Sequence, residues 1–165
     1  MRVARQVARG PGAVAPVARV TLDHAARLLR RRRLTCDDGS AVLVDLPSAT
    51  GLEDGDRLIC EDGAVIAVAA AAEPLWEVRG AGLARLAWHI GNRHAPCEIA
   101  GDALRIARDP VLGEMLRGLG AEVSEITAPF RPEGGAYGEG RVQGHAHGHD
   151  HSHPDHHHGD GHAHG

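Results

Sequence analysis

The sequence predicts an α+β protein with two folded parts and a histidine-rich tail. Short apolar runs separated by turn signals fill residues 1–72, a pattern typical of β-structure. Residues 73–140 alternate strand-like and helix-like periodicity in the order βαββαβ, the ferredoxin-like arrangement. The last 21 residues carry ten of the chain's thirteen histidines and no aromatic or branched apolar side chain. We expect residues 141–165 to be disordered without metal, because they cannot bury enough surface to offset the entropy of ordering.

In the first part, the clearest strands lie beside turns of the Asp-Gly type. Apolar runs at 41–46, 57–60 and 64–72 are expected to be strands, and the dipeptides Asp38-Gly39 and Asp62-Gly63 are expected to form hairpin-type turns. Strands spaced in this way predict a small β-sandwich or barrel, and we interpret it as a partner- or peptide-binding domain over residues 1–72.

Residues 21–31 show a weaker, helical pattern, with apolar residues near helical spacing, so we expect a helical turn there. The run Arg30–Arg33, which overlaps the end of this segment, is the main basic cluster. We interpret it as an exposed strand or helix end in preference to a nucleic-acid patch, since the net charge of −4 gives no general attraction to nucleic acid.

In the second part, Glu73-Pro74 is the expected boundary, because proline ends strands. Asp109 and Pro110 suit the N-cap and first position of a helix. Gly91-Asn92 is expected to close the preceding helix with a left-handed residue. The expected elements are a strand at 74–80, a helix at 81–94, strands at 97–100 and 103–107, a helix at 110–119 and a strand at 121–127. Residues 130–140 are interpreted as a Pro/Gly linker.

Several classes of protein are disfavoured by composition. No apolar run approaches the length of a membrane span, so we expect no membrane partner. Cys36, Cys60 and Cys97 are odd in number and form no CxxC pair, so a disulfide framework is not expected. Residues 1–16 are rich in Arg but lack a long apolar stretch. This favours a cytoplasmic protein over a secreted one, with a transit peptide as the alternative.

The tail indicates a metal-handling protein, because imidazole is the commonest protein ligand for borderline transition metals. An expression tag is the alternative, but a tag is usually an unbroken histidine run, whereas here histidine alternates with other residues. The candidate tail ligands are His145, His147, His149, His151, His153, His156, His157, His158, His162 and His164.

Outside the tail there are three histidines, and His94 is the candidate ligand among them. His89 lies five residues before it, a spacing that does not align two ligands on one helix face. His94 falls between a predicted helix end and Pro96, where a side chain is held but accessible, although a lone histidine such as His24 is more often an ordinary polar residue. The phosphate-loop, GxSxG and HExxH signatures are absent, so no enzyme activity is expected.

Three segments of the chain together resemble the UreE family of urease accessory metallochaperones. They are LAWHIGNRHAPCEI at 86–99, RIARDPVLGEMLRGLGAEV at 105–123 and APFRPEGGAYGEG at 128–140, followed by the histidine-rich end. The front matches more loosely, through RRLTCDDGSAVLVDLP and LEDGDRL. The resemblance covers roughly residues 20–165.

The resemblance implies a homodimer that delivers Ni²⁺ towards apo-urease together with the GTPase UreG. It implies an N-terminal domain that binds peptide or partner and a ferredoxin-like metal-binding domain. His94 would lie at the dimer interface, where both copies share one metal ion. Some members carry a His-x-His pair where this chain has Arg108 and Pro110, so that auxiliary site is expected to be absent.

We therefore expect a nickel metallochaperone for urease maturation, in which tail histidines complete the His94 site, since nickel prefers four to six ligands. Zn²⁺, Cu²⁺ or Co²⁺ can compete for the same imidazoles. The alternative is a storage or detoxification protein for nickel, zinc or copper that is not tied to urease. Cys60 and Cys97 are expected to be small buried residues and not ligands.

Overall fold

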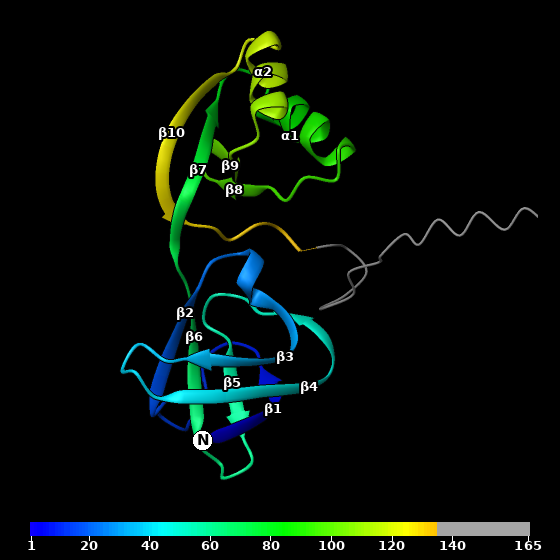
Figure 1. Cartoon of the computed structure of the whole chain (residues 1–165). Helices are drawn as coiled ribbons and strands as arrows, with labels where there is room; N and C mark the ends of the chain where they lie inside the picture. The colour runs from blue at the N-terminus through cyan, green and yellow to red at the C-terminus, as the bar shows by residue number, and fades with distance from the viewer. Residues whose placement is uncertain (135–165) are drawn as a thin grey trace, which may run out of the picture.

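The computed structural model describes residues 1–134 and contains two β-sheets at opposite ends of the molecule (Figure 1). The first sheet has the strand order β2-β6-β5-β1-β4-β3, and the second has the order β10-β7-β9-β8. The elements are β1 (Arg2–Ala8), β2 (Ala18–Leu22), the 3-10 helix η1 (Ala25–Arg27), β3 (Leu28–Thr35), β4 (Ala41–Gly51), β5 (Arg57–Cys60), β6 (Val65–Ala70), β7 (Ala72–Arg79), α1 (Leu83–Asn92), β8 (Glu98–Ala100), β9 (Ala103–Ala107), α2 (Pro110–Gly118) and β10 (Glu122–Pro129).

The first sheet curves around an aliphatic core. Side chains of β4 alternate between buried and half-buried from Ala41 to Leu46, as expected when one face of a strand meets the core. The N-terminal residues belong to this sheet, because β1 pairs with β4 in parallel and with β5 antiparallel. Fully or almost fully buried members of the core are Ala4, Val20, Val42, Val44, Leu58, Ile66 and Val68.

Both predicted Asp-Gly turns are confirmed. Gly39 and Gly63 have φ of 82° and 79°, a region that glycine enters without the steric cost of a Cβ. The Asp38 carboxylate accepts the backbone N–H of Ser40 at 2.9 Å, and that of Asp62 accepts the N–H of Ala64 at 3.1 Å. The aspartates therefore fix these turns through local side-chain hydrogen bonds.

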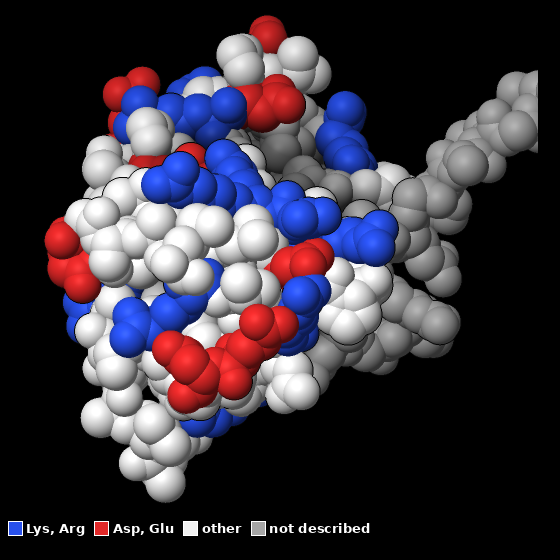
Figure 2. Space-filling view, turned by 60° about the horizontal axis from the view of Figure 1, so that its bottom comes forward, with Lys and Arg blue, Asp and Glu red and all other residues white. Residues whose placement is uncertain are grey.

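The helical turn expected at 21–31 is limited to η1, and the chain then enters β3. Arg30–Arg33 lie on β3 with exposed side chains, so the exposed-strand interpretation is confirmed. β3 is an edge strand of the sheet, and charges on an edge strand discourage pairing with another sheet. Figure 2 shows basic and acidic side chains interspersed at this end of the molecule.

The second sheet has the βαββαβ element order that the sequence predicts. All three of its strand pairs are antiparallel, and α1 and α2 lie together over one face (Figure 1). The buried core between helices and sheet consists of Trp76, Val78, Leu86, Ile90, Leu104, Ile106, Leu112, Leu116 and Ala121. The N-terminus of α2 is as predicted, since the Asp109 carboxylate accepts the N–H of Leu112 at 3.0 Å and Pro110 is the first helical residue.

The expectation that Pro74 ends the preceding strand is wrong. β6 already ends at Ala70, and β7 begins at Ala72 and runs through Pro74. β9 pairs with β7 only between Leu75 and Val78, so Pro74 lies where β7 has a single neighbour, β10. A proline is tolerated there because no second ladder requires its missing N–H.

Candidate metal site

His94 lies just beyond α1 with an exposed side chain and a left-handed backbone. The helix ends at Asn92, Arg93 caps it, and His94 has φ of 56°. The left-handed residue is therefore His94, not Gly91 or Asn92 as predicted. The backbone N–H of His94 donates to Gly91 O at 3.0 Å, which holds the residue in this conformation and directs the chain into the turn before β8.

A left-handed histidine is uncommon and costs about 1 kcal/mol relative to the right-handed region. Such strain at an exposed residue is typical of functional positions. Among residues 1–134, His94 is the only non-glycine residue with positive φ. The backbone observation therefore agrees with the sequence argument that singled out His94.

The other two histidines of the described chain are engaged elsewhere. His89 is half-buried and its ring lies edge-on to Trp88, with centroids 4.9 Å apart. His24 is half-buried beside Phe130, with ring centroids 5.2 Å apart, and burial, aided by the Arg27 charge, lowers its pKa. Within residues 1–134, no three His, Cys, Asp or Glu side chains converge to form a metal site, so a metal bound at His94 would need ligands from elsewhere.

Cys60 is buried, as the sequence predicts, whereas Cys97 is only half-buried. Cys36 is buried as well, and all three are free thiols. Burial raises the pKa of Cys60 and of Cys97. Their thiols therefore stay protonated near neutral pH, and a protonated thiol is a poor metal ligand.

Arg108 and Pro110 have structural roles. Arg108 donates to the backbone oxygens of Leu75 at 3.2 Å and Ile126 at 3.1 Å, tying the end of β9 to β7 and β10. Pro110 begins α2. Neither side chain can donate electrons to a metal, which supports the expectation that no His-x-His site is present at these positions.

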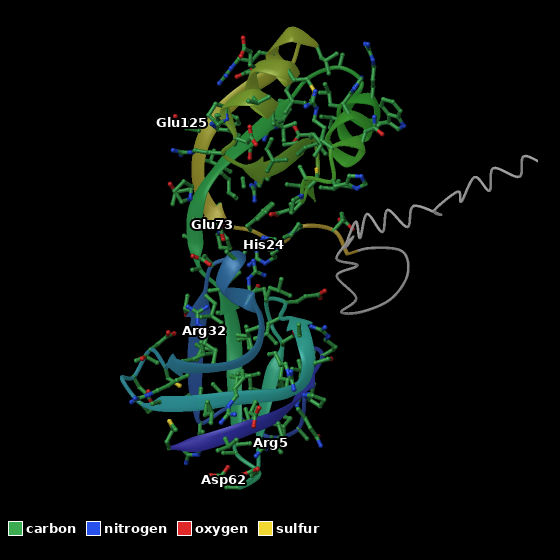
Figure 3. The ribbon with its side chains drawn as sticks, turned by 45° about the vertical axis from the view of Figure 1, so that its right-hand side comes forward. Arg5, His24, Arg32, Asp62, Glu73 and Glu125 are labelled. Atoms are coloured by element: carbon green, nitrogen blue, oxygen red, sulfur yellow. The ribbon has the colours of Figure 1, made fainter. Side chains whose placement is uncertain are left out.

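The interpretation of residue 130 onwards as a Pro/Gly linker is wrong for its first residues. Phe130 is fully buried, and the buried guanidinium of Arg27 donates to its backbone oxygen. We call residues 130–134 the strap. It crosses between the two sheets (Figure 1), and the His24 label in Figure 3 lies at this junction. Phe130 was the sequence signal for the strap, but its contact with Arg27 joins residues 103 positions apart in the chain.

The strap ends beside β8. This strand begins four residues after His94 in the chain. The backbone N–H of Arg131 donates to Glu98 Oε2 at 2.9 Å, and that of Glu133 donates to Cys97 O at 2.8 Å. The Arg131 guanidinium also reaches Asp54 Oδ2 at 2.8 Å. Asp54, in the turn between β4 and β5, therefore joins the strap to the part of the chain that carries the first sheet.

Exposed apolar side chains occur near His94. Trp88 on α1 and Ile99 on β8 are 63% and 58% exposed, and they lie six residues before and five residues after His94. A tryptophan with most of its surface in water is unusual outside a binding surface. Trp88 lies outside the stripe of α1 that faces the core, whose buried members are Leu86 and Ile90.

Family models and curated relatives agree on what this chain resembles. The model of the UreE urease accessory protein, C-terminal domain, matches residues 65–164, and that of its N-terminal domain matches residues 3–71. This chain belongs to the UreE urease accessory protein family. The C-terminal UreE match includes His94, the strap and nearly all of the tail.

Two UreE relatives illustrate the similarity. The urease accessory protein UreE of Paracoccus denitrificans (strain Pd 1222) is 59% identical over 125 residues, which are 76% of this chain and 80% of the relative. That of Ruegeria pomeroyi (strain ATCC 700808 / DSM 15171 / DSS-3) is 54% identical over 128 residues, 78% of this chain and 86% of the relative. The similarity therefore extends over most of both UreE chains.

Proposed function

We propose that this protein binds Ni²⁺ and delivers it for the maturation of urease. Membership of the UreE urease accessory protein family carries this proposal. The exposed, left-handed His94 supports it as the place where cargo metal is held. The histidine-rich tail, which lies outside the described residues, supplies further imidazoles. No catalytic step is proposed, and the protein acts as a chaperone and not as an enzyme.

The metal site is proposed to form between two copies of the chain. One His94 gives one nitrogen, whereas nickel prefers four to six N or O ligands. A second copy related by two-fold symmetry brings a second His94 to the same point. Exposed Trp88 and Ile99 offer apolar surface for that homodimer contact.

The tail is proposed to supply the remaining ligands. Its first histidine, His145, follows the strap end at Gly134 by about a dozen residues, which can extend to about 40 Å at most. A tethered imidazole therefore stays at high effective concentration near His94. Candidate ligands are His94 and His145, His147, His149, His151, His153, His156, His157, His158, His162 and His164.

An imidazole site of this kind suits a metal carrier. Neutral imidazoles bind Ni²⁺ one at a time and can be replaced one at a time by ligands of the receiving protein. A closed thiolate site of the structural-zinc type would release its metal poorly, and the described cysteines are buried or half-buried. Zn²⁺, Cu²⁺ and Co²⁺ would compete, so selectivity for Ni²⁺ must come from metal supply and partners.

We propose that three parts of the chain have different functions. Residues 1–72 form a partner-binding domain, residues 73–140 a ferredoxin-like metal-binding domain, and residues 141–165 the metal-gathering tail. The change of sheet between β6 and β7 and the strand order β10-β7-β9-β8 support this division. The proposed partners are the urease GTPase UreG and the urease apoenzyme, in the cytoplasm. No helix of the described residues is long and apolar enough to span a membrane.

Nickel titration by calorimetry tests the site. We expect His94→Ala to weaken the tightest Ni²⁺ site at least tenfold, because both copies lose their shared ligand. A full-length variant with all ten tail histidines changed to asparagine, the His-free tail variant, should mainly lower the number of Ni²⁺ ions bound.

His89→Ala is the matched control, since His89 lies on the same helix but packs against Trp88. Unchanged tight binding in His94→Ala would overturn the site assignment. If the wild-type protein shows no nickel-dependent association with the urease GTPase in a pull-down, the storage or detoxification function is favoured instead.

A further inference from the structure

The outer edge of β3 is open along most of its length. β3 pairs with β4 on one side and is the last strand of the first sheet on the other. From Leu29 to Thr35, the hydrogen bonds of residues 1–134 join its backbone to β4 alone. In an antiparallel pair, every second residue directs its N–H and C=O groups away from the neighbouring strand. Those groups of β3 have no partner within the described residues, and an edge of this kind can pair with a further strand.

The opposite edge of the same sheet is already occupied. The backbone N–H of Asp37 donates to Arg19 O on β2 at 2.8 Å, and the Thr21 hydroxyl donates to Asp37 Oδ2 at 2.7 Å. The loop that follows β3 therefore covers the edge of β2. Of the two edge strands of this sheet, β3 is the one that offers its backbone to a partner.

Four consecutive arginines give this edge its charge. Arg30–Arg33 are all exposed, and adjacent residues of a strand point to opposite sides. Arg31 lies 4.0 Å from Asp45, a carboxylate that also pairs with Arg5. The ion pairs within residues 1–134 include none of the other three arginines of the run. Figure 2 shows a band of basic side chains at this end of the molecule.

The charge decides which strand can pair here. Side chains that lie opposite one another on neighbouring strands are about 5 Å apart, and like charges in such pairs repel. The arginines therefore oppose pairing with β3 of a second copy or with any other basic strand. A strand that carries Asp or Glu at these positions instead gains opposite-charge pairs. Protection of the edge alone does not require a charge at every one of four successive positions.

We propose that the outer edge of β3 receives a partner protein by strand pairing, and that the segment it receives is extended and rich in Asp and Glu. The backbone ladder supplies affinity, and the arginines select for acidic side chains. Leu28, which is 47% exposed at the start of β3, offers an apolar contact at one end. This inference rests on the proposed function, because it takes residues 1–72 to be the partner-binding domain.

A protein segment fits this edge better than a nucleic acid does. Proteins that bind single strands stack the bases on aromatic side chains, and residues 1–72 contain no Trp, Tyr or Phe. The net charge of −4 also opposes a polyanion that extends beyond the four arginines. A short acidic segment meets the arginines without covering the rest of the negatively charged molecule.

Fluorescence anisotropy with the full-length protein tests the proposal. The probe is a labelled peptide in which Glu alternates with Thr, made eight residues long to match β3. Arg32→Thr/Arg33→Thr removes one arginine from each side of the strand and keeps a residue type that suits strands. We expect this variant to bind the peptide about threefold to tenfold more weakly, because it loses two exposed charge pairs.

A matched control removes the same charge elsewhere. Arg85→Gln/Arg117→Gln takes two exposed arginines from the helices of the second sheet, and it should bind the peptide as the wild type does. Equal weakening in both variants would mean that net charge, and not the edge of β3, governs binding, and the proposal would fail. Circular dichroism shows whether each variant folds, and the peptide comparisons that follow use the wild-type protein.

N-methylated peptides test the backbone ladder separately. Two versions of the probe carry methyl groups on the amide nitrogens of either the odd or the even residues. Pairing with one edge uses the amides of every second residue only. We therefore expect one version to lose affinity about tenfold or more and the other to bind like the parent peptide. If both versions bind like the parent, the arginines attract the peptide without strand pairing and the proposal is wrong.

Other ligands define further outcomes that contradict the proposal. A peptide with Lys in place of Glu should not bind, and equal binding would show that the edge does not select for acidic side chains. Tighter binding of oligothymidylate of matched length, lost in Arg32→Thr/Arg33→Thr, would assign the surface to nucleic acid. A changed oligomeric state of that variant on a sizing column would assign it to a second copy of the chain.

Pull-downs and nickel titration separate this inference from the proposed function. The acidic peptide in excess should displace the urease GTPase or the urease apoenzyme from the protein, and partner binding that the peptide does not reduce would contradict the inference. Arg32→Thr/Arg33→Thr leaves His94 unchanged, so its tight Ni²⁺ site should match the wild type. If His94→Ala leaves tight Ni²⁺ binding unchanged, the proposed function fails, whatever the peptide does at β3.

Discussion

At the scale of single residues, the conformation of His94 links the stability of the fold to the proposed metal binding. Its φ of 56° is one that glycine adopts freely and other residues adopt at a cost. The left-handed backbone of His94 therefore lowers the stability of the end of α1, and it places an imidazole at this point. The sequence identified His94 as a ligand candidate, but not its strain, because the site of the left-handed residue depends on where α1 ends.

This cost can be measured with His94→Gly. We expect the substitution to raise the free energy of unfolding by up to about 1 kcal/mol and, in the same protein, to remove the tight Ni²⁺ site. Urea denaturation in the presence of a chelator measures the first effect, and calorimetry measures the second. His94→Ala is the control, since it removes the imidazole but keeps the Cβ. Equal stability of the Gly and Ala variants would show that the backbone here is not strained.

At the scale of elements, local signals predicted most of the second sheet and its helices. Asp109 and Pro110 were sufficient to locate the start of α2 because capping involves only neighbouring residues. The strap was missed because its burial depends on Arg27, Asp54 and Glu98, which are distant in sequence. Pro74 was misjudged for a related reason: whether a strand tolerates proline depends on how many neighbours it has at that residue.

The packing of α2 against β7 gives a prediction with an internal control. A Cβ added at Gly113 would lie 2.1 Å from Cζ3 of Trp76, whereas one added at Gly118 would meet nothing within 4 Å. We expect Gly113→Ala to lower the free energy of unfolding by about 1–3 kcal/mol, through overpacking. Gly118→Ala, in the last turn of the same helix, should be neutral or stabilising by up to about 1 kcal/mol.

Chemical denaturation of both variants, with Trp fluorescence as the signal, measures the difference. The helix propensity of alanine acts in the same direction at both glycines, so the difference between the variants isolates the contact with Trp76. A Gly113→Ala protein as stable as Gly118→Ala would mean that the indole can move aside without cost.

At the scale of the whole molecule, the two sheets are joined by more than the covalent chain. The chain passes from the first sheet to the second at Ala71, and the strap then makes contacts with both (Figure 1). His24 takes part in this junction: its ring packs against Phe130, and its backbone N–H donates to Glu73 Oε2 at 2.8 Å. None of these long-range contacts could be read from periodicity or turn signals.

The junction makes stability depend on pH. Burial, with the nearby Arg27 charge, lowers the pKa of His24 in the folded state, against the opposing effect of Glu73 and Asp23. Below the unfolded value of about 6.5, the unfolded chain binds more protons at His24 than the folded chain does. The free energy of unfolding should therefore be greatest above pH 6.5 and fall as the pH drops towards the lowered pKa.

Urea titrations of metal-free protein between pH 8 and 5 measure this dependence. In His24→Phe, which keeps an aromatic ring against Phe130, the decline below pH 6.5 should be smaller than in the wild type. His89→Phe is the control, and its decline should match the wild type. Parallel curves for His24→Phe and the wild type would exclude His24 as a source of the dependence.

The contacts of the strap should also hold the two parts of the molecule together after the backbone between them is cleaved. A single cleavage at Ala71, the residue between β6 and β7, breaks the covalent passage from one sheet to the other. The fragments would still be held by Arg27 on the Phe130 carbonyl and by Asp54 on Arg131, so they should elute together from a sizing column under native conditions. A nicked molecule of this kind would keep its two halves associated until the Phe130 contact is disrupted.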